Sequence, residues 1–165
     1  MADTVTPEVR SRMMAAVRSR NTVPEMAIRK SLHASGFRYR IHKKIGKSRP
    51  DILLPKYSAA IFVHGCFWHG HVGCRYSRMP KSNVEFWTSK IERNAARDTR
   101  NEDEITQLGW RIAVVWECAV RDLGALEVCE KLADWLRQGG ATLEIESDVV
   151  AGEAPHGKTR SGRSA

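Results

Sequence analysis

Histidine, cysteine and aromatic residues are crowded into one short stretch of the chain, Phe62–Arg75. The stretch contains His64, His69, His71, Cys66 and Cys74, together with the adjacent pair Phe67 and Trp68. Imidazole nitrogens and thiolates are the usual zinc ligands in proteins, and a neutral histidine can also act as a general base near neutral pH. The stretch therefore indicates a metal site, a catalytic site or both, and we expect the rest of the chain to be arranged around it.

The cysteines favour a structural zinc site. Such sites hold the metal with four Cys or His side chains, usually as close pairs in sequence with a further ligand delivered by the fold. Three candidates lie in one predicted loop, and Cys118 follows a strand predicted over residues 110–116. Cys129 belongs instead to the apolar stripe of a predicted helix and is expected to be an ordinary core residue. We predict that Zn²⁺ is held by Cys66, His71, Cys74 and Cys118.

Two histidines then remain for chemistry, and Asp51 supplies an acid beside them. Asp51 lies in a strand predicted over residues 50–54, and the next predicted strand, residues 59–64, ends at His64. If these strands are antiparallel neighbours, Asp51 and His64 share one edge of the sheet, with His69 just beyond. A carboxylate and a main-chain carbonyl suit Mg²⁺, and a neutral histidine can take a proton from an attacking water. These parts predict metal-assisted hydrolysis of a phosphodiester.

Four predicted helices position these residues. Pro7 starts a basic helix over residues 7–20, whose apolar face carries three residues, Met13, Met14 and Val17. We expect one methionine to pack in the core, although a methionine among arginines could also enter a DNA groove. Thr22 and Glu25 form a capping box for the next helix, which Gly36 can end, so spacing alone favours a structural role for Glu25.

The later helices are also marked by caps and periodicity. Ser82 and Glu85 form a second capping box, which opens a long helix ended by Gly109. Its predicted inner side is formed by Val84, Trp87, Ile91, Ala95, Ile105 and Leu108. The last helix is predicted over residues 123–138, with Leu126 and Cys129 in its apolar stripe.

Composition suggests one domain that binds a polyanion. Residues 1–50 hold twelve Lys or Arg against three Asp or Glu, which favours contact with nucleic acid over a plain solvated surface. Residues 1–140 are expected to form a single domain, and residues 141–165 a disordered basic tail. Neither a membrane span nor a signal peptide is expected, so we predict a cytoplasmic protein.

At this point the chain resembles the very short patch repair (Vsr) DNA mismatch endonucleases over about residues 8–120. The string His64–His69, HGCFWH, is highly specific, and Arg49–Asp51, RPD, is weak alone. Further matches are Thr22–Glu25, His71, Cys74, Glu85–Trp87, Lys90–Ile91, Asn94, Arg97–Asp98, Leu108–Arg111 and Val115–Cys118.

The resemblance implies an α/β fold with a restriction-endonuclease-like three-layer core, in which helices flank a mixed sheet. It also implies a Mg²⁺-dependent enzyme that nicks duplex DNA 5′ to the thymine of a T:G mismatch left by 5-methylcytosine deamination. A DNA-bound monomer follows, with other repair proteins as candidate partners.

By position, Asp51 resembles the Mg²⁺-ligating aspartate, assisted by the main-chain carbonyl of Val63. His69 and His64 resemble the catalytic histidines, and Glu25 the helix-borne acid of the metal water shell. Both zinc and wedge residues also have counterparts: Cys66, His71, Cys74 and Cys118 match the zinc ligands, and Phe67, Trp68 and Met14 match the wedge that enters the base stack. Inserting apolar side chains costs less at a mismatch, so the wedge itself would select the lesion.

Two departures from the family pattern and two rival functions remain. Val63 stands where some members have Thr, but a main-chain ligand should tolerate this change. Gly73 lengthens the zinc loop, which could alter its shape but not its ligand count. The rivals are a non-catalytic, zinc-stabilised DNA-binding module and another metal-dependent nuclease, such as an HNH-like enzyme with a histidine-held metal in a ββα site.

Overall fold

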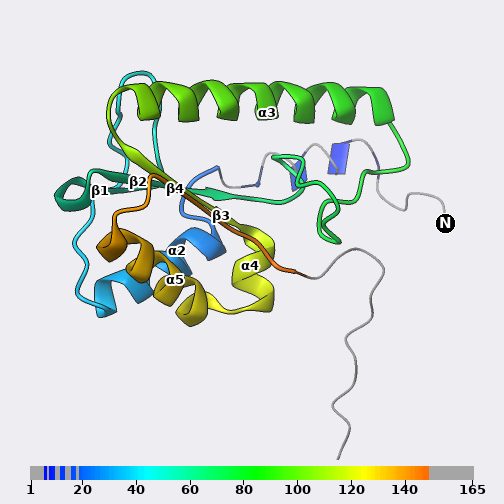
Figure 1. Cartoon of the computed structure of the whole chain (residues 1–165). Helices are drawn as coiled ribbons and strands as arrows, with labels where there is room; N and C mark the ends of the chain where they lie inside the picture. Colours follow the sequence, from blue (N-terminus) through cyan, green and yellow to red (C-terminus); the bar gives the residue numbers. More distant parts are fainter. Residues whose placement is uncertain (1–5, 7, 10–11, 14–15, 18, 149–165) are drawn as a thin grey trace, which may run out of the picture.

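A mixed sheet of four strands forms the centre of the protein (Figure 1). The computed structural model describes residues 6, 8–9, 12–13, 16–17 and 19–148. The strands lie side by side in the order β1 (Ile52–Leu54), β2 (Ala59–His64), β3 (Arg111–Trp116) and β4 (Thr142–Ile145). β1 is antiparallel to β2, whereas the β2–β3 and β3–β4 pairs are parallel. The antiparallel pairing of β1 and β2, which the argument for Asp51 required, is therefore confirmed.

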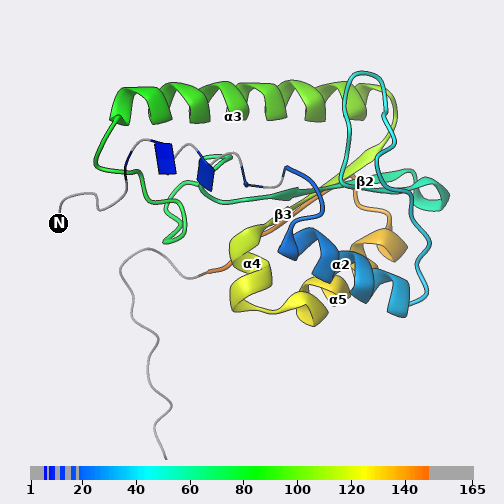
Figure 2. The same cartoon turned by 180° about the vertical axis from the view of Figure 1, so that it is seen from behind.

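Helices cover both faces of this sheet. The layer on one face is α3 (Val84–Gln107), and the other face is covered by α2 (Val23–Ala34), α4 (Glu117–Asp122) and α5 (Ala125–Gln138), as Figures 1 and 2 show. A short 3-10 turn, η1 (Pro55–Tyr57), joins β1 to β2. The expected three-layer α/β core is confirmed.

Alternation along β2 decides where the catalytic candidates point. Ala59, Ile61 and Val63 belong to the core shared with α2 and α5, while Ala60 and Phe62 belong to the core shared with Ile105 of α3. Successive side chains of a strand point to opposite faces, so His64 lies on the α3 side. Its ring is 5.3 Å from that of Trp116, which belongs to the same core.

The start of α2 follows the predicted capping box only in part. Thr22 is the N-cap, and its Oγ1 accepts a hydrogen bond from the N–H of Glu25 at 3.4 Å. The Glu25 carboxylate accepts from the N–H of Asn21 at 2.9 Å, one residue earlier than a standard capping box would place it. Glu25 thus does cap the helix, as its spacing indicates.

The predicted start of α3 is wrong. Its N-cap is Asn83 in the left-handed conformation, φ 53°, with no side-chain capping hydrogen bond, and the helix begins at Val84. The predicted inner side is correct for Trp87 and Ile105, which are buried, but Val84, Ala95 and Leu108 are exposed. Only Trp87 and Ile105 of α3 are buried, because polar residues lie between them on the same side of the helix. These polar residues face the site described below.

The end of the chain also differs from the prediction. The helix expected over residues 123–138 is α5, which begins two residues later, at Ala125, but Leu126 is exposed rather than buried. The short helix α4, which precedes it, was not predicted. Cys129 is buried in the core, as expected. Residues 142–145, which were expected to belong to a disordered tail, form β4, and every residue of β4 pairs with β3.

Only parts of the predicted helix over residues 7–20 are described. Residues 8–9 and 12–13 are helical, but residues 16–17 and 19–20 form turns and bends, so the helix is shorter than predicted. Met13 is 61% exposed rather than packed in a core. Met14 lies outside the described residues. None of the helices in the described part of the chain is long and apolar enough to span a membrane.

Candidate active site and metal centre

Asp51 is fixed at the start of β1 by the neighbouring strand. The N–H of Val63 donates to its Oδ2 at 2.7 Å, and the N–H of Asp51 donates to the carbonyl of Ile61 at 3.1 Å. Burial, together with the nearby Glu25 carboxylate, raises the pKa of Asp51 from 3.8 to about 6, although the hydrogen bond from the Val63 N–H opposes this rise. A carboxylate that has lost this much hydration favours a bound cation.

Glu25 lies beside Asp51, linked to it by Arg29. The Arg29 guanidinium donates to Glu25 Oε2 at 3.0 Å and to the main-chain carbonyl of Asp51 at 3.4 Å. Both Glu25 and Arg29 are buried. Arg29 was not singled out from the sequence, because its position on α2 looks like an ordinary i, i+4 partner of Glu25.

The two histidines meet on the α3 side of the sheet. The rings of His64 and His69 are stacked, with centroids 4.0 Å apart and an interplanar angle of 3°. Burial, and then the neighbouring His69, lower the pKa of His64 to about 3, so His64 is neutral at working pH. Ligand atoms of His64, His69 and Asp98 lie within 4.8 Å of one another, so their spacing would allow a cation. Ring nitrogens bind a metal within the ring plane, however, and the two imidazole planes are parallel, which does not favour the HNH-like alternative.

Asp98 completes this group, and the sequence reading gave it no role. Its Oδ2 lies 2.5 Å from Nδ1 of His69. Burial raises the pKa of Asp98, but the hydrogen bond and the electrostatic interaction with His69 outweigh this effect and hold that pKa below its usual value. Asp98 therefore stays ionised and keeps the proton of His69 on Nδ1.

Helical spacing could have identified Asp98. The buried Trp87 starts a row of residues on α3 that continues through Ile91, Asn94 and Asp98 to the buried Ile105. Polar residues within an otherwise inward row indicate a helix face that borders a site. The partner residue is far away in sequence, so only the fold shows that it is His69.

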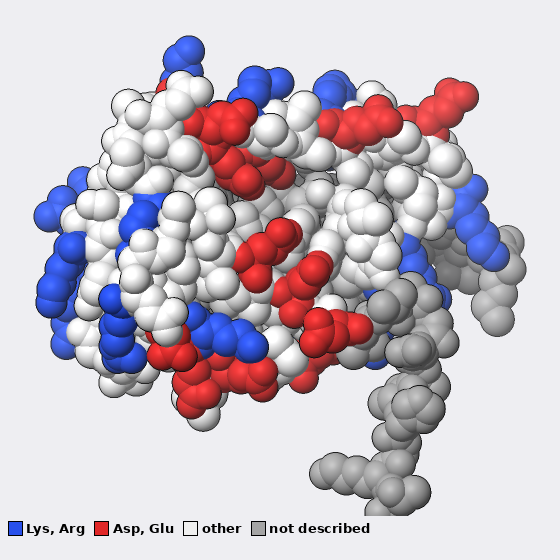
Figure 3. Space-filling model, in the orientation of Figure 1, with Lys and Arg blue, Asp and Glu red and all other residues white. Residues whose placement is uncertain are grey.

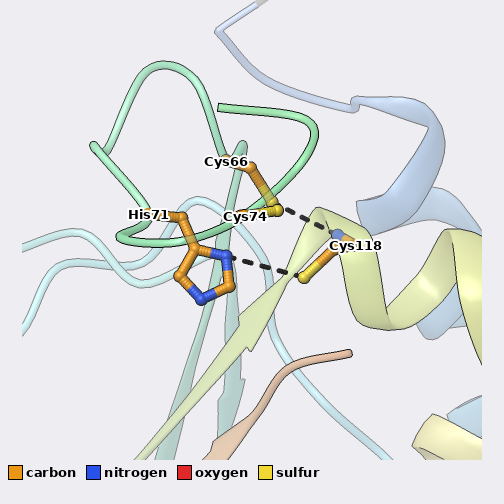
Figure 4. Close-up of side chains that lie close together, drawn as sticks. All are labelled: Cys66, His71, Cys74 and Cys118. Carbon is orange, nitrogen blue, oxygen red and sulfur yellow. Dashed lines mark hydrogen bonds between the residues drawn. The ribbon is translucent and has the colours of Figure 1, made fainter. Parts of the chain in front are cut away.

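The four predicted zinc ligands converge at the other end of the same loop (Figure 4). Ligand atoms of Cys66, His71, Cys74 and Cys118 all lie within 4.8 Å of one another. Nδ1 of His71 is 3.6 Å from the Cys118 sulfur. Burial raises the pKa of the Cys66 and Cys118 thiols, and a bound metal would offset this cost by stabilising the thiolates. Three sulfurs and one imidazole form a set typical of structural zinc.

The extra loop residue does not displace a ligand. Gly73 has φ 72° and no atom within 4 Å of the position that a side chain would occupy, and Val72 is 93% exposed. The loop therefore bulges into open space while Cys74 remains in the cluster.

The two adjacent aromatic residues rest on α3. Phe67 and Trp68 contact Trp87, with ring centroids 5.5 and 6.0 Å away, and both are only half-buried. Asn94 donates to the main-chain carbonyl of Trp68 at 2.9 Å. A side chain at Gly70, φ 64°, would come within 2.6 Å of Ile91, so the loop packs closely on the helix there. Trp87 thus extends the predicted wedge into an aromatic cluster.

A basic groove runs along α3 next to this cluster. It has a volume of about 540 Å³ and is lined by Phe86, Lys90, Arg93, Asn94, Ala96, Arg97 and Arg100. The Lys90 ammonium lies 5.5 Å from the ring of Trp68, which joins the groove to the aromatic cluster. Positive charge beside exposed aromatic rings is typical of nucleic-acid contact surfaces.

Comparisons with known proteins identify the family of this chain. Residues 2–75 match the family described as "DNA mismatch endonuclease Vsr". The "Type II nicking enzyme V.XorIIP" of Xanthomonas oryzae pv. oryzae is 52% identical over 127 residues, 77% of this chain and 93% of the relative. The "DNA mismatch endonuclease Vsr" of Escherichia coli is 36% identical over 153 residues, 91% of this chain and 97% of the relative.

A nicking enzyme of Neisseria meningitidis, V.NmeAIP, is 44% identical over 122 residues, 74% of this chain and 86% of the relative. Among solved structures, the catalytic domain of the homing endonuclease I-Bth0305I aligns with a TM-score of 0.48 and 19% identity, over 73% of this chain and all of that domain. Because the Xanthomonas and Escherichia relatives are matched over nearly their whole length, the chain belongs to the Vsr family of DNA mismatch endonucleases and is a nuclease that acts on DNA.

Proposed function

We propose that this enzyme nicks one strand of duplex DNA 5′ to the thymine of a T:G mismatch, in a reaction that requires Mg²⁺. The proposal rests on one arrangement above all: His69, held by Asp98, lies next to a desolvated Asp51 and directly follows the aromatic pair in sequence. The printed name of the Escherichia coli relative, a mismatch endonuclease, and those of the nicking relatives support it.

The residues near Asp51 fit Mg²⁺ better than a softer metal. Asp51 supplies an oxygen ligand on a strand edge, and the main-chain carbonyl of Val63 is the second ligand that we propose. Glu25, which lies close enough to perturb Asp51, would accept hydrogen bonds from the metal's water shell. When bound, Mg²⁺ would stabilise negative charge on the phosphate.

The protein's own residues would supply the proton transfer. With its proton held on Nδ1 by Asp98, His69 can use Nε2 to take a proton from the water that attacks the phosphorus. His64, buried and neutral, packs its ring against His69 and keeps that ring in place. We therefore assign His69 as the general base and His64 as its neighbour in the active site.

Recognition of the mismatch is assigned to the aromatic pair. Phe67 and Trp68, with Met14 from the N-terminal segment, would enter the base stack beside the mismatch. Unstacking a base step costs a few kcal/mol, and less at a mismatched pair, so the insertion itself would favour T:G over fully paired DNA. The contacts to Trp87 and Asn94 support this role, because a wedge must be held rigidly to be effective.

We propose further that Cys66, His71, Cys74 and Cys118 hold one structural Zn²⁺, which fixes the loop carrying the wedge and His69. We also propose an oligomeric state, a location and partners. The enzyme would work as a monomer on chromosomal DNA in the cytoplasm, together with other repair proteins.

The test is a nicking assay on matched and T:G duplexes, read at nucleotide resolution, with and without Mg²⁺. Asp51→Ala and His69→Ala should abolish nicking and keep the zinc content of the wild type. The double variant Phe67→Ala/Trp68→Ala should lose its preference for the mismatch more than its affinity for phosphate.

Three results would contradict the proposal. Full nicking by Asp51→Ala or His69→Ala would remove that residue from the mechanism. Equal losses on matched and mismatched duplexes would count against the wedge. A wild-type protein that binds DNA but never nicks it with Mg²⁺ would support the non-catalytic, zinc-stabilised binding module instead.

A further inference from the structure

The segment that follows β4 lies against the thiol cluster. The N–H of Ser147 donates to the sulfur of Cys118 at 3.4 Å, and the side chain of Ser147 also bonds to Asp122. Asp122 in turn binds Arg75, the residue next to Cys74, at 2.5 Å. Residues 144–147 were expected to belong to a tail, but they contact the surroundings of two predicted zinc ligands.

Glu146 makes the most direct of these contacts. Its Oε2 lies 2.5 Å from Nε2 of His71, while the other ring nitrogen, Nδ1, faces the Cys118 sulfur. An ionised carboxylate can only accept a hydrogen bond, so the proton of a neutral His71 lies on Nε2. The lone pair of Nδ1 is then directed at the sulfurs, as a metal ligand requires.

The ring of His71 is also held from its face. It stacks on Trp116 with centroids 4.0 Å apart and an interplanar angle of 5°. The indole N–H of Trp116 donates to Glu144 at 2.7 Å. Glu144 and Glu146 are alternate residues of one extended segment, so this short piece of chain fixes both the face and the edge of the same imidazole.

We propose that Glu146 is a positioning residue for the metal ligand His71, and that residues 144–147 form the outer wall of the zinc site. This inference rests on the zinc site proposed above. Carboxylates that accept a hydrogen bond from a ligating histidine fix its orientation and increase its basicity, and their loss typically weakens metal binding about 10- to 100-fold. The Glu146 side chain is 53% exposed, so we expect an effect of about 10-fold.

The experiment measures zinc binding by the full chain in competition with a chromophoric chelator. Glu146→Ala should weaken zinc binding about 10-fold and speed zinc release. Glu146→Gln keeps an oxygen that can accept from Nε2 but loses the charge, so its affinity should lie between those of the wild type and Glu146→Ala. Asp148→Ala is the matched control: it removes one negative charge from an exposed residue two positions away and should bind zinc like the wild type.

The outcomes distinguish a failure of the role of Glu146 from a failure of the proposed zinc site. Unchanged zinc affinity in both Glu146 variants, with one zinc per wild-type chain, would overturn the role of Glu146 and leave the zinc site intact. Wild-type protein without zinc would overturn the proposed metal and this inference together. If Asp148→Ala weakened zinc binding equally, the effect would come from the general negative field of nearby acids and not from the contact between Glu146 and His71. If Glu146→Ala does not fold, Glu146→Gln still gives the decisive comparison.

Discussion

Two carboxyl groups of the site have pKa values that are shifted in opposite directions within a small volume. Asp51 is buried enough for its pKa to rise to about 6, whereas Asp98 on the facing helix has a pKa below its usual value because of His69. Differently tuned carboxylates of this kind are typical of active sites, where one binds a cation and another orients a base.

The link between Asp98 and His69 predicts a large kinetic effect. Asp98→Asn should lower the nicking rate constant by about 10²- to 10⁴-fold, because an amide can donate to Nδ1 and stabilise the wrong imidazole tautomer. DNA affinity should stay the same. Single-turnover nicking and a binding isotherm measure the two quantities, and Asp103→Asn, an exposed acid on the same helix, is the control. A loss confined to DNA binding would contradict the assignment.

The raised pKa of Asp51 also predicts a stability difference that depends on pH. Because the folded-state pKa, about 6, exceeds the ordinary value of 3.8, Asp51 favours the folded state at low pH and loses this contribution as pH rises through 6. Without added divalent metal, Asp51→Asn should be more stable than the wild type by about 1–3 kcal/mol at pH 8.

This advantage should shrink as the pH is lowered from 8 toward 5, when the wild-type carboxyl becomes protonated. Denaturant unfolding at several pH values measures it. Asp134→Asn, at an exposed position on α5, is the control. A constant difference across this range would show that desolvation of Asp51 is not its origin.

At the scale of elements, we propose that α3 serves both chemistry and DNA contact. One side of the helix carries Asp98 and Asn94 toward the loop, and the basic groove lies along its length. Helix periodicity predicted that α3 exists. It could not predict that the helix contacts the proposed wedge and the proposed base, His69, and also lines the groove, since these partners are separated from it in sequence.

The groove predicts a salt-dependent contribution to binding. Arg93→Ala and Arg100→Ala should each weaken DNA binding to matched and mismatched duplexes alike, and each should reduce the slope of log K against log salt by about 0.9. Fluorescence anisotropy at several salt concentrations measures this slope. Lys131→Ala, on α5 in the opposite layer, should leave it unchanged. A loss specific to T:G duplexes would indicate that these arginines read the mismatch instead.

The elements that the sequence predicted well are those with strong local patterns. β2 and β3 are continuous apolar runs and α2 has its cap, so their positions were clear. β4 is short and mostly exposed, and its stability comes from pairing with β3, which no local pattern encodes. Likewise, the zinc set followed from residue types, whereas Asp98 and Glu146 are ordinary surface-like acids until the fold places them.

At the scale of the whole molecule, acidic side chains are concentrated in one part of the surface. On the face shown in Figure 3, acidic side chains gather between α3 and the layer of α4 and α5. Burial raises the pKa of Glu102 on α3, and the nearby Asp98 and Glu144 of β4 raise it further. This acidic face would repel a phosphate backbone, so we expect DNA to approach from the side of the basic groove.

Removal of zinc should loosen the site without unfolding the core. The sheet and its helices bury their own apolar clusters, so chelation should lower Tm but preserve helical circular dichroism. Nicking with added Mg²⁺ should be lost and then restored by zinc, because the loop carries both His69 and the wedge. Cys129→Ala should still bind one zinc per chain. An unchanged Tm after verified zinc removal would show that the cluster does not brace the loop.

The position of β4 has a consequence for synthesis of the enzyme. β4 and Glu146 follow all the other described elements in the chain, and β4 pairs in parallel with a strand made about thirty residues earlier. While the ribosome still holds this segment, His71 lacks its carboxylate and Cys118 lacks the N–H of Ser147. Because domains fold as units, the loop with the wedge and the base should become rigid only after this segment emerges. A nascent chain that has not yet exposed this segment would then be a poor nuclease.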